Sequence, residues 1–342
     1  NWEAEVAKFL PDFKTFVLHG TSRGKLFGKL NECDIAITTY ALAVRDLSQW
    51  ADVQLDAVVL DEASYLRNPD TKVSKAIRAL SQLAGVRIAL TGTPIENGVK
   101  DLWAIMECVV PGYLGTRADF RERYEKPLAS TVGLSPRDVR RLTERLSRRI
   151  QPFFLRRTKN VVAKDLPSKI ESVQLVELTS TQTALYRTIA QEAANQMQDT
   201  AKTGNAGAAR MHMLTALLRL RQVCCDPRLV AENAEESDSA KLGALMELMD
   251  RLMADGHSVL VFSQFVSMLS IIRKNMEAAG LEYCYLDGAS SDRKEQVASF
   301  QSSRDKRAFL ISLKAGGYGL NLTKADVVIH YDPWWNPAVE AQ

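Results

Sequence analysis

The sequence predicts an α/β protein with two parallel-sheet lobes and a helical insertion between them. Short apolar runs alternate with helical patterns over residues 1–110 and again over residues 241–342, which is typical of βαβ units. Residues 111–240 instead favour long helices and include an acidic, small-residue stretch at 231–240 that suits a linker. We therefore predict an N-terminal lobe (1–110), a helical insertion with its linker (111–240) and a C-terminal lobe (241–342).

The N-terminal lobe is predicted to alternate strands with helices. We expect strands at residues 15–18, 34–38, 55–60 and 86–90. We expect a turn and short helix over 22–30 and helices over 70–83 and 101–110. The helix over 70–83 is indicated by apolar residues that share one face at helical spacing, namely Val73, Ala76, Ile77 and Leu80.

The insertion contains the most basic part of the chain. Ser135, Pro136 and Asp138 predict a helix start, because they supply a capping residue, a proline at the first helical position and an acid three residues after the cap. One face of this helix carries the arginines 137, 140, 141, 145, 148 and 149. The face is either a solvated amphipathic surface or a contact for a nucleic-acid backbone or an acidic patch. Two long helices are expected over 181–200 and 206–224.

The C-terminal lobe repeats the alternation of strands and helices. We expect helices over residues 241–254, 266–279 and 292–301. We expect strands over residues 258–262, 282–286, 308–313 and 326–331. This order predicts a second parallel sheet of similar build.

The composition favours a globular protein and gives no sign of a membrane span or a zinc site. At 342 residues the chain is long enough for two domains, and 46% hydrophobic with 25% charged residues is typical of globular proteins. No stretch approaches the roughly 18 consecutive apolar residues of a membrane span, so no membrane partner is expected. The net charge of +3 is too small by itself to indicate nucleic-acid binding. The five cysteines form no CxxC pair, which favours reduced thiols over a zinc site.

Two adjacent carboxylates, Asp61 and Glu62, follow the apolar run at residues 57–60. That short, valine-containing run fits a strand buried on both faces, which would deliver the two acids to the carboxyl edge of a sheet. One carboxylate there can hold Mg²⁺, and the other can orient and deprotonate an attacking water. The alternative is a strand that simply meets a solvated acidic turn.

A second strand repeats this plan about thirty residues later. Residues 87–90 lead into the hydroxyl-rich turn Thr91, Gly92 and Thr93. Because the carboxyl ends of parallel strands meet at one edge of a sheet, we expect this turn to lie beside Asp61 and Glu62. A plain turn followed by a helix cap is the alternative for this segment.

Motif-like stretches occur along the whole chain. In the N-terminal lobe they are residues 34–40 (DIAITTY), 61–64 (DEAS) and 90–97 (LTGTPIEN). In the insertion they are residues 152–159 (PFFLRRTK), 165–169 (DLPSK) and 220–227 (LRQVCCDP). In the C-terminal lobe they are residues 259–265 (VLVFSQF), 312–322 (SLKAGGYGLNL) and 332–337 (DPWWNP). This set, in this order, resembles the Snf-type (switch/sucrose-non-fermenting) family of double-stranded-DNA translocases in helicase superfamily two.

The resemblance implies two RecA-like lobes that hydrolyse ATP in the cleft between them. Asp61 would hold Mg²⁺, and Glu62 would position the hydrolytic water. ATP would be contacted by Thr91, Gly92 and Thr93 in the first lobe and by Gly319 and Asn321 in the second. The resemblance also implies a set of DNA contacts, which are Thr38, Thr39, Ser312, Lys314, Arg156 and Arg157.

The sequence departs from the family pattern in three places. It contains no G-x-x-x-x-G-K-[ST] loop, since the nearest candidate, residues 20–26, has three intervening residues and ends in Leu26. It stops at Gln342, before the family's motif VI and its arginine fingers. We therefore expect a piece of a longer protein that hydrolyses ATP negligibly alone. Ser64 stands where the family usually has Gln or His, which brings the coupling of hydrolysis to DNA movement into question.

The sequence thus predicts a DNA-dependent ATPase, a helicase-like hydrolase that moves along double-stranded DNA and remodels DNA-bound protein complexes. We expect it in the bacterial cytoplasm on the nucleoid, or in the nucleus if the source is eukaryotic. Two alternatives remain open. One is an ATP-dependent RNA helicase or ribonucleoprotein remodeller, against which the long insertion argues. The other is a nucleotide-dead scaffold that grips DNA through its arginine helix.

Overall fold

The computed structural model describes residues 2–95, 98–129, 135–163, 165, 167–202, 206–231, 234–235, 238–316, 319–336 and 340. The chain divides into two compact units, residues 1–168 and residues 169–342. Both are α/β units with parallel strands, as the sequence predicts. The boundary between them falls inside the predicted insertion, so the three-part division stays a prediction.

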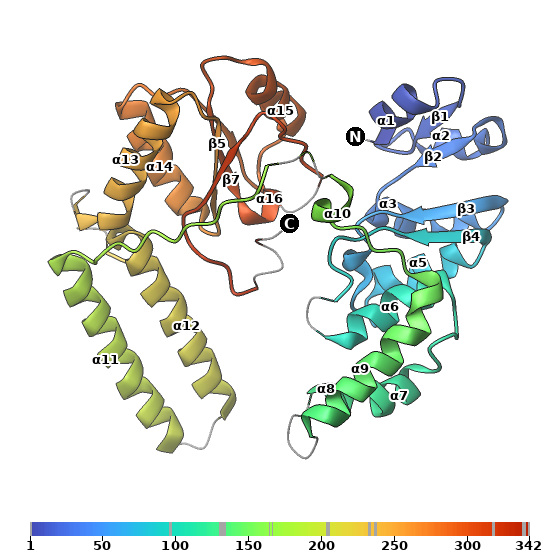
Figure 1. Ribbon diagram of the computed structural model, residues 1–342, viewed down its shortest axis with the longest axis horizontal. Helices are drawn as coiled ribbons and strands as arrows, with labels where there is room; N and C mark the ends of the chain where they lie inside the picture. Colours follow the sequence, from blue (N-terminus) through green and yellow to red (C-terminus); the bar gives the residue numbers. More distant parts are fainter. Residues whose placement is uncertain are drawn as a thin grey trace. The chain divides into compact units, whose positions relative to one another are not determined.

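Unit 1 holds two separate pairs of parallel strands in its described part (Figure 1). Strand β1 (Thr15–Val17) pairs with β2 (Ile35–Ile37). Strand β3 (Leu55–Leu60) pairs with β4 (Ala84–Ala89), with Leu60 opposite Ala89. All four strands lie where the sequence predicts them, although β4 begins two residues before the expected start at residue 86.

The helices of unit 1 comprise predicted and additional elements. The predicted ones are α2 (Gly24–Phe27), α5 (Lys72–Ser81), α6 (Val99–Val109) and α9 (Pro136–Ile150). The additional ones are α1 (Trp2–Phe9), α3 (Tyr40–Arg45), α4 (Leu47–Trp50), α7 (Arg117–Phe120), α8 (Lys126–Ala129) and α10 (Lys159–Val162). The additional helices are mostly single turns, which carry little periodic signal in a sequence.

The prediction that the strand before Asp61 is buried on both faces is wrong. Leu60 is buried and belongs to the core of unit 1, but Val59 is 51% exposed. The residues beside it on the same face of β4, Val86 and Ile88, are 55% and 44% exposed. The reason is that α5 and α6 pack against this two-stranded sheet on one side only.

Helix α9 begins as its capping signals predict. The Ser135 hydroxyl accepts a hydrogen bond from the Asp138 backbone N–H at 3.2 Å, and the Asp138 carboxylate accepts one from the Ser135 N–H at 3.3 Å. The apolar side of the helix is anchored by Leu146, which is buried in a cluster with Trp103 and Phe120. The arginine side is therefore turned to solvent.

Unit 2 is built on a four-stranded parallel sheet in the order β6-β7-β5-β8. The strands are β5 (Val259–Ser263), β6 (Tyr283–Leu286), β7 (Ala308–Ser312) and β8 (Val327–His330). Helices α13 (Ala240–Ala254) and α14 (Val266–Ala278) cover one face, and α15 (Arg293–Ser302) covers the other. Every residue of β7 is buried, because the sheet has helices on both faces.

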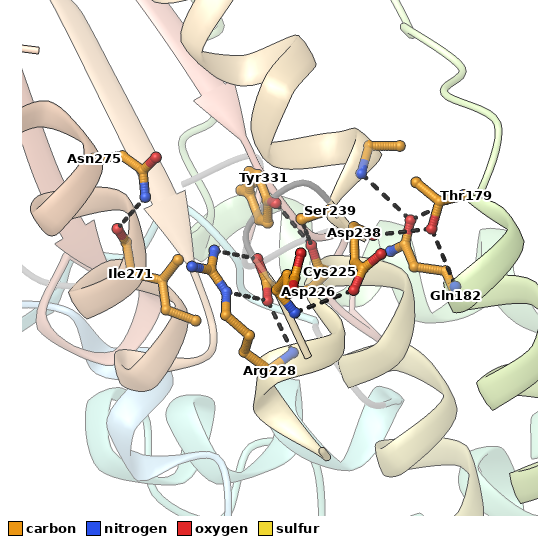
Figure 2. A network of polar contacts seen from close by, with 12 residues as sticks. Thr179, Gln182, Cys225, Asp226, Arg228, Asp238, Ser239, Ile271, Asn275 and Tyr331 are labelled. Atoms are coloured by element: carbon orange, nitrogen blue, oxygen red, sulfur yellow. Dashed lines mark hydrogen bonds and ion pairs between the residues drawn. The ribbon is translucent and has the colours of Figure 1, made fainter. Parts of the chain in front are cut away.

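A hairpin of two long helices, α11 (Ser180–Lys202) and α12 (Ala206–Cys225), belongs to unit 2. Figure 2 shows the polar network that ties it to the sheet. The Cys225 carbonyl accepts hydrogen bonds from the Tyr331 hydroxyl at 2.8 Å and the Ser239 hydroxyl at 3.2 Å. The buried Gln182 amide donates to the Val223 carbonyl at 2.8 Å. The motif at residues 220–227 therefore anchors the hairpin beside the end of β8.

Among the helices that the structure describes, none has both the length and the apolar composition that a membrane crossing needs.

The two-sided cover of the unit 2 sheet makes its stability sensitive to truncation. Phe309 is fully buried, with its ring centroid 5.2 Å from that of Phe300. We expect Phe309→Ala to destabilise unit 2 by about 3–5 kcal/mol. Val328→Ala, at a side chain that is 54% exposed, should change stability by less than about 1 kcal/mol. Hydrogen exchange of the β7 amides measures both effects, and equal protection in the two variants would contradict this assignment of the core.

Candidate functional site

The carboxyl ends of β3 and β4 are joined by backbone hydrogen bonds just where the two motifs begin. The Leu90 N–H donates to the Leu60 carbonyl, and the Ala63 N–H donates to the Leu90 carbonyl, both at 2.8 Å. The turn at residues 91–93 therefore lies at the same sheet edge as Asp61 and Glu62. The expected neighbourhood of the two motifs is confirmed.

Glu62 has an unusual backbone conformation. Its φ of 47° and ψ of 52° lie in the left-handed region, and it is the only non-glycine residue with positive φ in the described part of the chain. This conformation costs an L-residue roughly 1–2 kcal/mol. Strained residues concentrate at functional sites, so the outlier singles out Glu62 within the motif.

The carboxylate of Asp61 is held in place by two donors. Its Oδ1 accepts a hydrogen bond from the Glu62 N–H at 3.0 Å, and its Oδ2 accepts one from the Trp2 indole Nε1–H at 2.7 Å. The side chain is nevertheless exposed to solvent. Each carboxylate oxygen keeps a lone pair after one such bond, so Asp61 can still ligate a cation.

A stacked pair of tyrosines is joined to the backbone of Asp61. The Tyr40 hydroxyl donates a 2.6 Å hydrogen bond to the backbone carbonyl of Asp61. The Tyr40 ring stacks on the Tyr65 ring, with centroids 5.5 Å apart and the planes 1° from parallel. Burial, followed by the nearby charge of Asp61, raises the pKa of Tyr40, so its hydroxyl stays a donor at neutral pH.

The environment of Glu62 favours its protonated form. Partial burial raises the pKa of the Glu62 carboxyl, and the adjacent negative charge of Asp61 raises it further. A carboxylate with a raised pKa is a stronger base than an ordinary one. Glu62 therefore has the chemistry of a general base, while Asp61 has the chemistry of a cation ligand.

The residues at this edge fit a magnesium ion. Mg²⁺ prefers oxygen ligands, keeps several of its waters and commonly uses only one or two carboxylates. Asp61 supplies an exposed carboxylate with free lone pairs, and the half-buried hydroxyl residues Thr91 and Thr93 lie at the same edge. The Thr91 hydroxyl also accepts a hydrogen bond from the Thr93 N–H at 3.1 Å, which folds the turn back on itself.

The predicted DNA contacts of unit 1 occupy two different places. Thr39 caps α3, with its hydroxyl accepting from the Leu42 N–H at 3.3 Å, and the Thr38 hydroxyl donates to the Leu18 carbonyl at 3.4 Å. Arg156 and Arg157 are exposed in the extended segment after residue 153. The two threonines directly precede Tyr40 in the chain. Their role toward DNA stays a prediction.

The predicted residues of unit 2 follow the end of β7. Ser312 is buried, and its hydroxyl accepts a hydrogen bond from the Ala315 N–H at 3.3 Å, whereas Lys314 is exposed. Gly319 has a φ of 66°, and the Asn321 carbonyl accepts from the Gln301 amide at 2.8 Å. Lys314 thus presents a charge to solvent, while Ser312 has an internal hydrogen bond. Their roles toward DNA and nucleotide stay predictions.

A glycine at position 316 is required by packing. A Cβ placed there would lie 2.5 Å from a ring carbon of Phe262 and 3.0 Å from a methyl of Ile311. Both side chains belong to the sheet of unit 2, so neither can move away cheaply. Gly316 lets the turn after β7 pack directly on the sheet.

Three participants were not predicted from the sequence. The Trp2 indole contacts Asp61, and the Tyr65 ring contacts Tyr40, although neither residue was expected at the site. Tyr40 directly follows the Thr38-Thr39 pair, so its position could have suggested a role. In unit 2, the Arg221 guanidinium lies 4.3 Å from the ring centroid of Trp335, which joins two family motifs.

Comparison with known proteins covers the whole chain. Residues 1–229 match the SNF2-related domain, and residues 240–342 match the helicase conserved C-terminal domain. The chain is 36% identical to a protein of Bacillus subtilis named putative ATP-dependent helicase/translocase YwqA, with all of this chain and 37% of the relative covered. An uncharacterized ATP-dependent helicase of Mycoplasma pneumoniae is 33% identical, with 100% and 32% covered.

A solved structure of similar sequence is the SWI2/SNF2 ATPase core of Sulfolobus solfataricus in complex with dsDNA. It is 35% identical, and 98% of this chain and 69% of that chain are covered with a TM-score of 0.46. The chain spans about a third of the length of the curated relatives named above. Since the SNF2-related match alone extends over residues 1–229, well over half of the sequence, the chain belongs to the SNF2 family, as its motifs indicate.

Proposed function

We propose that the protein is a DNA-dependent ATPase that uses ATP hydrolysis to move along double-stranded DNA and to remodel what is bound there. The observation that carries this proposal is the edge shared by β3 and β4, where the strained Glu62 lies next to Asp61 and beside the Thr91–Thr93 turn. Phosphoryl transfer needs positioning and charge stabilisation more than covalent help, and this edge offers both.

Each group at the edge has a distinct task in this proposal. Glu62 orients the attacking water and takes its proton. Asp61 holds a Mg²⁺ ion, which when bound neutralises negative charge on the phosphates. Tyr40 fixes the backbone carbonyl of Asp61, and so keeps the carboxylate pair in place. Thr91, Gly92 and Thr93 contact the terminal phosphate of ATP.

The names of two relatives support DNA as the nucleic acid in this proposal. Proteins about 30% identical to this chain are named as a DNA excision repair protein of mouse and as a chromatin-remodeling ATPase of yeast. Unit 1 also presents Arg156 and Arg157 to solvent, and cations of this kind bind phosphate backbones. An RNA helicase is the competing function. ATPase stimulation by duplex DNA and not by RNA supports the proposal, and the reverse pattern would refute it.

Glu62→Gln should abolish most of the turnover of the full-length protein. We expect kcat to fall by roughly 10²- to 10⁴-fold, because the amide cannot accept the proton of water. Nucleotide affinity should change little. Steady-state ATPase assays with duplex DNA, together with equilibrium binding of a labelled nucleotide, test both statements. Glu5→Gln, on the exposed surface of α1, is the matched control. Wild-type turnover in Glu62→Gln would exclude Glu62 as the base.

The raised pKa of Glu62 predicts a pH-dependent effect on stability. Because the folded state disfavours the ionised form, the contribution of Glu62 to stability is fully present at low pH and declines as the pH rises through its raised pKa. The melting temperature of Glu62→Gln relative to wild type should therefore increase between pH 4 and pH 8. A difference that stays constant over this range would show that burial and Asp61 do not act on this carboxyl.

We also propose that the 342 residues alone do not turn over ATP, because their sequence has no loop of the G-x-x-x-x-G-K-[ST] form. An ATPase assay of the chain with and without duplex DNA tests this proposal. The full-length protein assayed at the same concentration is the positive control. Duplex-stimulated turnover by the chain alone would contradict it.

A further inference from the structure

The arginine face of α9 is a second place on unit 1 that can hold an anion, apart from the Asp61–Glu62 edge. Arg141, Arg145 and Arg148 follow one another at spacings of four and three residues, so they share one side of the helix. All three are exposed. With Arg149 and Tyr113 they line an open hollow on the surface of unit 1.

Two residues that line this hollow, Arg149 and Tyr113, are bonded to each other. Arg149 donates to the Tyr113 carbonyl at 2.7 Å, and the Tyr113 hydroxyl donates to the Arg149 carbonyl at 2.8 Å. The Tyr113 ring also packs edge-on against Phe153, with centroids 4.8 Å apart. Arg149 and Tyr113 therefore hold each other through two hydrogen bonds, whereas the other three arginines of the hollow are exposed to solvent.

The three remaining arginines have no acidic partner within the described residues. The nearest acids on the helix are already engaged, since Glu144 pairs with Arg140 at 3.0 Å and Asp138 forms the capping box with Ser135. Like charges at these spacings repel one another and destabilise the helix. A bound polyanion would remove that repulsion.

We infer that this α9 face binds the phosphate backbone of duplex DNA as a contact additional to the motif residues. Seven residues of α-helix span about 10.5 Å, and a duplex carries about six phosphate charges over that length. One guanidinium group can donate two parallel hydrogen bonds to the oxygens of a phosphate. An open row of arginines is therefore suited to a row of phosphates. An acidic peptide with apolar side chains fits this hollow less well, because Tyr113 is the one apolar side chain among the described residues that line it, and its ring is already packed against Phe153.

The inference rests on the proposed function, because it takes duplex DNA as the partner. Its test uses Arg141→Ala/Arg145→Ala/Arg148→Ala in the full-length protein. The control, Lys29→Ala/Lys72→Ala/Lys75→Ala, removes three exposed cations from other parts of unit 1. Both variants lose the same net charge, so a general effect of charge would weaken both equally.

Binding to a 30-base-pair duplex is measured by fluorescence anisotropy from 50 to 200 mM salt. In the α9 variant, the slope of log K against log salt should become shallower by about 2.7, which is about 0.9 for each lost phosphate contact. Affinity at 100 mM salt should fall roughly tenfold or more. The control should change by less than a third of either effect.

Two other outcomes would overturn the inference. If the α9 variant keeps the wild-type slope but loses binding to polyglutamate, the partner is an acidic protein segment. If it keeps both, the face is only a solvated surface. A wild-type protein that neither binds duplex DNA nor responds to it in the ATPase assay would instead refute the proposed function. Circular dichroism controls for loss of the helix.

Discussion

The site depends on one local constraint, the pair of backbone hydrogen bonds that joins the ends of β3 and β4. Leu90 contributes both its N–H and its carbonyl, and it thereby fixes where each strand gives way to its turn. Because the strands are parallel, both turns emerge at the same edge. A shift of one residue in this register would move every side chain of the shifted strand to the opposite face. The acids and the hydroxyl turn could not then meet as they do.

The strained backbone of Glu62 follows from this constraint. The chain must leave β3 and return a hydrogen bond from Ala63 to Leu90 within three residues, and the left-handed turn at Glu62 permits this. Asp61 is held from two sides, by Trp2 at its carboxylate and by Tyr40 at its carbonyl. The strain is thus supported by neighbours that do not themselves carry chemistry, an arrangement common where geometry matters for function.

The sequence predicted the structure best where the determining residues lie close together along the chain, as in helix periodicity and turn chemistry. The capping box of α9 and the strand limits of β3 follow from residues within a few positions of each other. The contact of Trp2 with Asp61 spans 59 residues and leaves no local pattern. The burial of individual strand residues could not be predicted from the sequence either, because Val59 on β3 and Val261 on β5 lie in similar apolar runs. Val59 is 51% exposed and Val261 is fully buried, because in the described structure the sheet of unit 2 has helices on both faces and the β3–β4 pair has them on one.

Charge in this chain has to be considered locally. A net charge of +3 over 342 residues suggests no particular partner, because acids elsewhere offset the basic helix. On α9 itself the only acids are Asp138 and Glu144, and they are bonded to Ser135 and Arg140. Arg141, Arg145 and Arg148 form no ion pair with any residue that the structure describes, so this face carries positive charge toward solvent. Salt screens such a surface within about 10 Å at 0.1 M, so the face attracts a partner only at close range. Its contribution is then to hold a polyanion that has already arrived.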